Sequence, residues 1–104
     1  RWMVACDGAH SSIRKSLGLE FRGETLPYDF ALADVRVDGL GLPADEMGLF
    51  LHAEGMVVVI PMRNGHSRLI ADLGPSRGGE RTTPTLDDIQ AIAASRIGSA
   101  VSVS

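Results

Sequence analysis

The sequence lacks the features of secreted and membrane proteins. Cys6 is its only cysteine, so the chain forms no internal disulfide. It has no run of about 18 apolar residues, so no transmembrane helix is predicted, and no signal peptide is visible. Hydrophobic residues make up 44% of the chain and charged residues 22%, an ordinary globular composition. These observations favour a cytoplasmic protein.

The chain also lacks an excess of positive charge. Its net charge is −3, which argues against a nucleic-acid binder because such proteins need a basic surface. The charge is uneven: residues 1–23 hold four basic and two acidic side chains, a balance of +2, and the remainder therefore carries −5. The basic first quarter can attract a phosphate. Neither His52 nor His66 has the spacing of a metal site, so none is predicted.

The first segment is predicted to be a strand, a tight turn and a short helix. Residues 2–6 form an apolar run that is stopped by Asp7-Gly8, a turn dipeptide. Ser11 is placed to cap a helix over residues 12–17. Gly18 stands where such a helix needs a left-handed residue to end.

Alternation of apolar and polar residues predicts strands over 29–37 and 47–53, and then a hairpin. Strands over 56–63 and 66–73 are separated by Asn64-Gly65, the strongest short signal for a two-residue turn. Such a turn pairs Ile60 with Leu69. One face of the hairpin would then carry Met56, Val58, Ile60, Met62, Leu69, Ala71 and Leu73.

The last third is predicted to be a polar loop, a helix and a strand-like end. After the loop at 74–85, Thr85 and Asp88 form a capping box for a helix over 86–97, whose buried stripe would hold Leu86, Ile89, Ile92, Ala93 and Ile97. The whole pattern is α+β, an antiparallel sheet with two helices. Because the chain opens on an apolar run and ends in an alternating stretch, we expect a fragment of a longer protein. The strand edges at 2–6 and 100–104 would be unpaired, so we expect self-association.

The chemistry is concentrated in residues 7–14, D-G-A-H-S-S-I-R, which follow an apolar run and open a helix. Such a turn exposes backbone N–H groups at a helix N-terminus, which is a favourable place for an anion to bind. Gly8 lets a ligand approach the backbone closely, and Asp7 is suited to hold a sugar hydroxyl or to orient the turn. Arg14 lies one helical turn beyond Ser11, where its guanidinium can bind a phosphate.

This string resembles the D-G-x-x-S-x-x-R motif of the flavoprotein aromatic hydroxylases, the para-hydroxybenzoate hydroxylase-like family. The likeness includes Leu17-Gly18-Leu19 and Phe21-x-Gly23; it is strong over residues 3–23 and looser over 29–98. It implies a fragment of the FAD-binding fold of that family, with residues 1–23 in the FAD-binding part and 24–104 in the substrate-binding sheet domain. It also implies a monooxygenase that uses FAD, NAD(P)H and oxygen to hydroxylate an aromatic or polycyclic small molecule.

The resemblance also implies roles for the motif residues. Asp7 and Gly8 would lie beside the ribityl-pyrophosphate part of FAD, and His10 and Arg14 would contact NAD(P)H. Ser11 is assigned to capping first and to cofactor contact second. No catalytic residue is assigned.

Two motifs of the family, a Rossmann G-x-G-x-x-G and a later Gly-Asp, do not occur in the sequence. The string at residues 39–44 matches G-x-G-x-x-A, but Pro43 and the acidic residues after it do not open a phosphate-binding helix. We therefore expect the fragment alone to be inactive and not to hold FAD. Two alternatives stay open: a related FAD-dependent reductase or epoxidase, and a non-enzymatic α+β binding or dimerisation module in which the motif is accidental.

Overall fold

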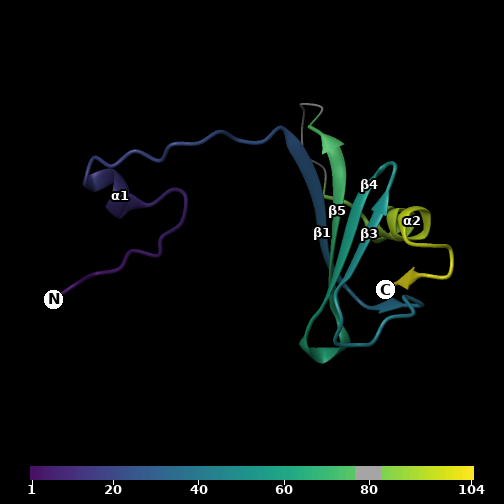
Figure 1. The fold of residues 1–104 in the computed structure, drawn as a ribbon. Coiled ribbons are helices and arrows are strands. Elements are labelled where there is room, and N and C mark those ends of the chain that lie inside the picture. Colours follow the sequence, from purple (N-terminus) through teal and green to yellow (C-terminus); the bar gives the residue numbers. More distant parts are fainter. Residues whose placement is uncertain (77–82) are drawn as a thin grey trace.

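The computed structural model describes residues 1–76 and 83–104. An N-terminal segment with a short helix, α1 (Ser12–Ser16), projects away from a sheet that carries a second helix, α2 (Leu86–Arg96), on one face (Figure 1). The projection makes the chain elongated, with extents of 53 × 37 × 22 Å. The predicted polar loop at 74–85 lies partly outside the described residues.

The predicted first helix is confirmed, whereas the predicted strand at 2–6 is wrong. Ser11 caps α1, because its Oγ accepts a hydrogen bond from the N–H of Arg14 at 3.0 Å. Gly18, with φ of 66°, ends it as expected. Residues 2–6 are extended but exposed, and no described segment pairs with them. A strand forms only where a neighbouring strand supplies hydrogen-bond partners for its backbone N–H and C=O groups. An apolar run in the sequence does not by itself provide that neighbour.

The described residues form two antiparallel sheets. The larger consists of β1 (Tyr28–Val35), β3 (Gly48–His52), β4 (Gly55–Pro61) and β5 (Ser67–Pro75), in the order β1-β5-β4-β3. The smaller pairs β2 (Val37–Asp38) with β6 (Ser102–Val103). The predicted antiparallel α+β arrangement with two helices is therefore confirmed.

The predicted unpaired edge at residues 100–104 is wrong. This stretch pairs with β2, and the backbone N–H and C=O of Arg36 both bond to Ser104, at 2.9 and 3.1 Å. The strand predicted over 29–37 is divided at Arg36 into β1 and β2. The chain end therefore closes on its own sheet, and this edge no longer supports self-association.

The hairpin is present, but its predicted register is off by one residue. Met62 donates its N–H to the carbonyl of His66 at 2.8 Å, which leaves a three-residue turn, η1 (Arg63–Gly65). Ile60 therefore pairs with Arg68, and Val59 pairs with Leu69. As a result β4 buries Val57 and Val59, not the predicted Val58 and Ile60. Because β4 is apolar on both faces, its sequence pattern does not distinguish the two registers.

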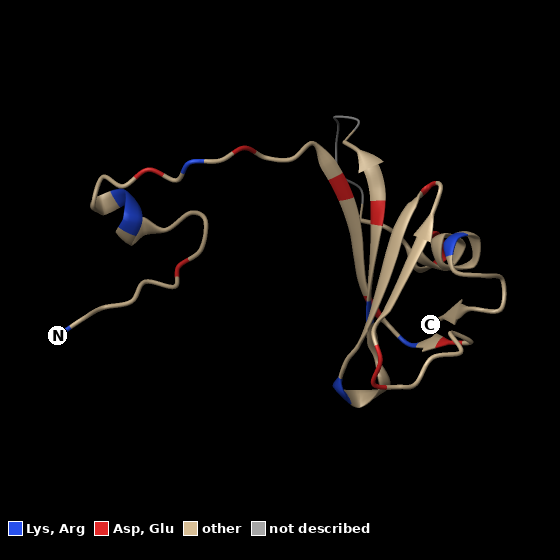
Figure 2. Cartoon of the chain, in the orientation of Figure 1, with Lys and Arg blue, Asp and Glu red and all other residues tan. Residues whose placement is uncertain are grey.

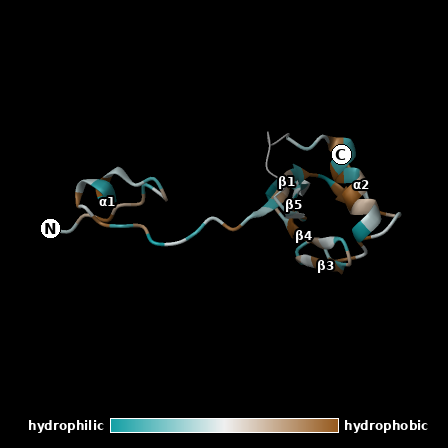
Figure 3. Ribbon diagram, turned by 90° about the horizontal axis from the view of Figure 1, so that it is seen from above, coloured by the Kyte–Doolittle hydropathy of each residue, from teal (hydrophilic) through white to brown (hydrophobic). Residues whose placement is uncertain are grey.

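The core lies between α2 and one face of the larger sheet, as the view from above shows (Figure 3). Thr85 and Asp88 form the predicted capping box, with Asp88 Oδ2 accepting from the Thr85 N–H at 2.8 Å. Leu86 is exposed, contrary to the predicted stripe, because it precedes the turns that face the sheet. The buried apolar residues are Ala31, Val35, Val57, Val59, Leu69, Ala71, Ile89, Ala93, Val101 and Val103.

Candidate cofactor-binding site

The Asp7 turn is held by the chain's own hydrogen bonds. Asp7 Oδ2 accepts from the N–H groups of Ser12 and Ile13, at 2.9 and 3.3 Å, and from the Ser12 hydroxyl at 3.3 Å. The N–H of Ser11 donates to the carbonyl of Gly8 at 3.0 Å. The first N–H donors of α1 are therefore occupied. The prediction that they are exposed for an anion is wrong, because Asp7 itself takes the place of that anion.

Ionisation of Asp7 supports the same turn. The pKa of its carboxyl lies below the usual value because the Ser11 hydroxyl, foremost, and the backbone N–H groups of Ile13 and Ser12 stabilise the charged form. Three hydrogen bonds, from Ser12 and Ile13, reach Oδ2. A carboxylate oxygen suits a hydroxyl donor and repels a phosphate.

Gly8 and His10 leave the surface of the turn open. Gly8 has φ of 72°, and a Cβ built on it would meet no atom within 4 Å. A ligand can therefore approach the backbone here, and a side chain would be strained in this conformation. His10 is exposed, and no hydrogen bond or ion pair within the described residues involves it.

Arg14 packs against its own segment. Its guanidinium carbon lies 4.7 Å from the centre of the Phe21 ring, within the range of a cation–π interaction. Its Nε is buried, and no partner for it lies among the described residues. A buried donor without an acceptor is costly. Sequence reasoning did not identify the Phe21 contact.

We expect acidification to loosen the Asp7 turn. Because the folded-state pKa of Asp7 is lowered, its contribution is full above the usual pKa of an aspartate and is lost as the pH falls through the lowered value. The helical 13Cα shifts of Ser12–Ser16 should persist at mildly acidic pH and fade at more acidic pH. Asp7→Ala should abolish them at every pH, whereas Glu24→Ala, in the same segment, should not. Unchanged shifts in Asp7→Ala would contradict this role.

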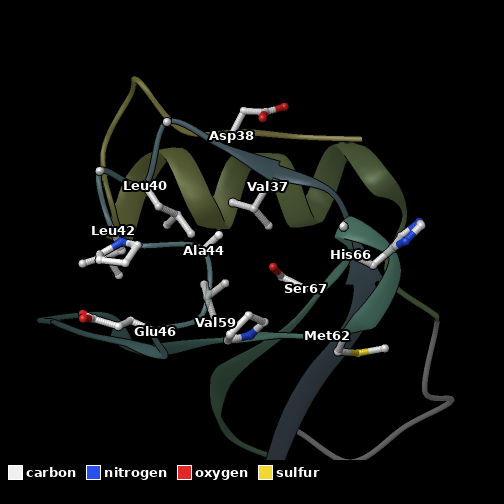
Figure 4. Close-up of a pocket in the computed structure, with 15 residues that line it drawn as sticks. Val37, Asp38, Leu40, Leu42, Ala44, Glu46, Val59, Met62, His66 and Ser67 are labelled. Carbon is white, nitrogen blue, oxygen red and sulfur yellow. The ribbon is translucent and has the colours of Figure 1, made fainter.

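A pocket of about 280 Å³ lies between the loop that follows β2 and the end of the hairpin (Figure 4). Val37, Leu40, Val59 and Met62 supply apolar lining, and Ser67 contributes a hydroxyl. The rejected glycine string at 39–44 forms part of this loop and opens no helix, which confirms that it is not a phosphate-binding start. Sequence reasoning missed the pocket because packing between distant segments creates it.

The face of the larger sheet opposite α2 is uncovered; we refer to it as the open face. Its side chains alternate with the buried ones, and a row of apolar residues crosses all four strands in register. The members of this row are Leu32, Ile70, Val58 and Leu49. An exposed apolar row of this kind is a candidate binding surface.

The described residues hold no group of three or more His, Cys, Asp and Glu side chains placed to bind a metal ion. None of their helices is both long enough and apolar enough to cross a membrane.

Comparison with known families decides what the motif represents. The family described as FAD binding domain matches residues 1–103. The chain belongs to this FAD-binding family. This match, together with the relatives named below, confirms the predicted resemblance to FAD-dependent aromatic hydroxylases. No solved structure matches the chain.

Curated relatives of this member of the FAD-binding family are named 3-(3-hydroxy-phenyl)propionate/3-hydroxycinnamic acid hydroxylase. The protein of Mycobacterium sp. (strain JLS) is 40% identical over 48 residues, 46% of this chain and 8% of that protein. The Klebsiella pneumoniae protein (strain ATCC 700721 / MGH 78578) is 43% identical over 42 residues, 40% of this chain and 8% of its own. The protein of Escherichia coli (strain K12 / DH10B) is 40% identical over 43 residues, which are 41% of this chain and 8% of that protein. The matched part is thus a small share of each relative.

Proposed function

We propose that this chain is part of a flavoprotein monooxygenase that uses FAD, NAD(P)H and oxygen to hydroxylate an aromatic or polycyclic small molecule. The observation that carries the proposal is the FAD-binding family match over residues 1–103, together with the hydroxylases among the relatives. In this proposal residues 1–23 belong to the FAD-binding part and residues 24–104 to the substrate-binding sheet domain of a para-hydroxybenzoate hydroxylase-like fold.

The Asp7 turn fits the hydroxyl-bearing part of FAD better than its phosphates. The Asp7 carboxylate would accept from a ribityl hydroxyl, and the open backbone at Gly8 would allow that close approach. Ser11 contributes by capping α1 and so keeps the turn in place. When bound, FAD supplies the redox chemistry, and the protein contributes binding, orientation and exclusion of water.

The nicotinamide cofactor is assigned to the basic side of the segment. The two basic residues of α1, Arg14 and Lys15, lie in its last turn, the blue part of the helix in Figure 2, and the proposed contact is that of Arg14 alone. The guanidinium of Arg14 has the fork geometry that suits a phosphate, which supports contact with an anionic ligand. His10, four residues before Arg14 in the chain, is exposed and can add a hydrogen bond.

The open face of the sheet is the proposed wall for substrate. Leu32, Ile70 and Val58 lie side by side across β1, β5 and β4, and present an apolar surface to which a planar ring can bind. An isoprenoid chain, the substrate type of the alternative reductase or epoxidase, would also meet apolar contacts here. Product analysis separates the two: incorporation of one atom of labelled oxygen into an aromatic ring supports the hydroxylase.

The Arg14 assignment is tested in the FAD-loaded protein that contains this chain. Arg14→Ala is expected to slow flavin reduction or to raise the NAD(P)H requirement by about ten- to a hundred-fold, since losing a charge-assisted contact costs about 1.5–3 kcal/mol. FAD content should stay near the wild-type level. Anaerobic stopped-flow reduction at varied NAD(P)H measures the effect.

Lys15→Ala is the matched control, because Lys15 is an exposed cation on the same helix. It should change reduction little. Equal rates in wild type and Arg14→Ala, with flavin content intact, would remove Arg14 from the nicotinamide site and leave Asp7 and Gly8 as the cofactor residues.

A further inference from the structure

An ion pair stands at the border of the apolar row on the open face. Asp34 of β1 and Arg68 of β5 lie directly opposite each other in the strand register. Arg68 Nε donates to Asp34 Oδ1 at 2.7 Å, and Nη2 donates to Oδ2 at 2.8 Å. Two parallel bonds of this kind hold both groups in a defined orientation.

This pair is accessible to a ligand that covers the open face. The side chains of Arg68 and Asp34 are 42% and 43% exposed. Ile60 pairs with Arg68 on the next strand. On the same face, Leu32 lies two residues before Asp34 in β1, and its partner Ile70 lies two residues after Arg68 in β5. A ring bound over Leu32 and Ile70 would therefore bring its substituents to the ion pair.

The pair offers hydrogen bonds without net charge. Hydrogen bonding to Arg68, foremost, lowers the pKa of Asp34, and Asp34 raises the pKa of Arg68, so both groups stay ionised near neutral pH. Asp34 occupies Nε and Nη2 of the guanidinium. The N–H groups on Nη1 are not used by Asp34 and can donate to an oxygen of a ligand.

We propose that the Asp34–Arg68 pair selects aromatic substrates whose substituent at this position is an uncharged oxygen, such as a hydroxyl or a ketone, over those with a carboxylate there. A neutral oxygen accepts from Nη1 without opposition. A carboxylate at the same place is attracted by Arg68, but Asp34 already neutralises the guanidinium and repels the carboxylate from the opposite edge, so less Coulomb energy is gained to offset its loss of hydration. An arginine without this partner would favour the carboxylate.

This inference rests on the proposed function, because it takes the open face as the substrate wall. The test uses the FAD-loaded protein that contains this chain and two probes of equal shape, 3-hydroxyacetophenone and 3-hydroxybenzoate. Their dissociation constants are measured by equilibrium dialysis, and their hydroxylation is measured separately. Wild type should bind the ketone more tightly.

Asp34→Asn removes the negative charge and leaves an amide that still accepts from Arg68. It is expected to shift the ratio of the two dissociation constants toward the carboxylate by about ten-fold, the effect of a partly exposed charge. Asp45→Asn makes the same charge change on an exposed loop and should leave the ratio unchanged. Because the readout is a ratio, it does not depend on the amount of folded protein.

The outcomes separate the two proposals. Tighter binding of the carboxylate by wild type, or an unchanged ratio in Asp34→Asn while flavin reduction and hydroxylation remain, would overturn the inference and leave the function standing. If wild-type protein reduces its flavin with NAD(P)H but hydroxylates no aromatic probe, the proposed function fails, and the inference fails with it.

Discussion

Replacing Leu69 by alanine is expected to lower the free energy of unfolding by about 2–5 kcal/mol, the usual cost of emptying a well-packed leucine site. Leu69 lies on the central strand β5, is 0% exposed, and pairs with Val59 on one side and Ala33 on the other. These strands and α2 surround its side chain and cannot all collapse into the space left behind. Urea denaturation of the 104-residue chain measures the change.

Leu51→Ala is the matched control, because Leu51 lies on the edge strand β3 and is 78% exposed. Its effect should stay within about 0.5 kcal/mol. If the two leucines cost the same, Leu69 does not lie in the core and the assigned register of β4 and β5 is wrong.

Gly39→Ala is expected to have the second large effect. It should lower the free energy of unfolding by about 2–4 kcal/mol, for two combined reasons. Gly39 has φ of 82°, which strains any residue with a Cβ. That Cβ would also overlap the backbone carbonyl oxygen of Ala100, just before β6. Backbone cannot move aside as a flexible side chain does, so β2 and β6 must separate. Urea denaturation and loss of the amide protection of Ser104, whose N–H bonds to Arg36, would report it.

Gly41→Ala isolates the contribution of backbone strain. Gly41 has φ of 67°, but nothing lies within 4 Å of a Cβ placed there. We therefore expect Gly41→Ala to lower the free energy of unfolding by only about 1–2 kcal/mol. An equal cost at both glycines, with Ser104 still protected in Gly39→Ala, would show that the close approach of residues 39 and 100 does not hold the small sheet together.

Local features were predicted well because their partners are close in sequence. The Ser11 cap and the Thr85–Asp88 capping box each join residues three positions apart, so their spacing in the sequence defines the contact. The glycine that ends α1 follows from the same short-range geometry. Such elements need no tertiary information.

The site was predicted only in part. The motif at residues 7–14 indicated a turn and a capped helix, and both are present. The sequence did not predict that Asp7 binds the N–H groups at the N-terminus of α1 in place of a ligand, because a sequence does not show where a carboxylate points. The stacking of Arg14 on Phe21 was also missed, because it depends on how the chain turns after the helix. The cofactor contacts of His10, Ser11 and Arg14 stay predictions.

The sequence by itself determined the motif at residues 7–14, and with it the FAD-binding family, together with the caps and the α+β class. The tertiary structure decided which face of β4 is buried, because Val57 and Val58 are equally apolar and only the packing of α2 distinguishes them. It also decided that residues 102–103 pair with 37–38, a contact between segments far apart in the chain. Local propensity cannot specify such pairings, because they depend on the arrangement of the whole sheet.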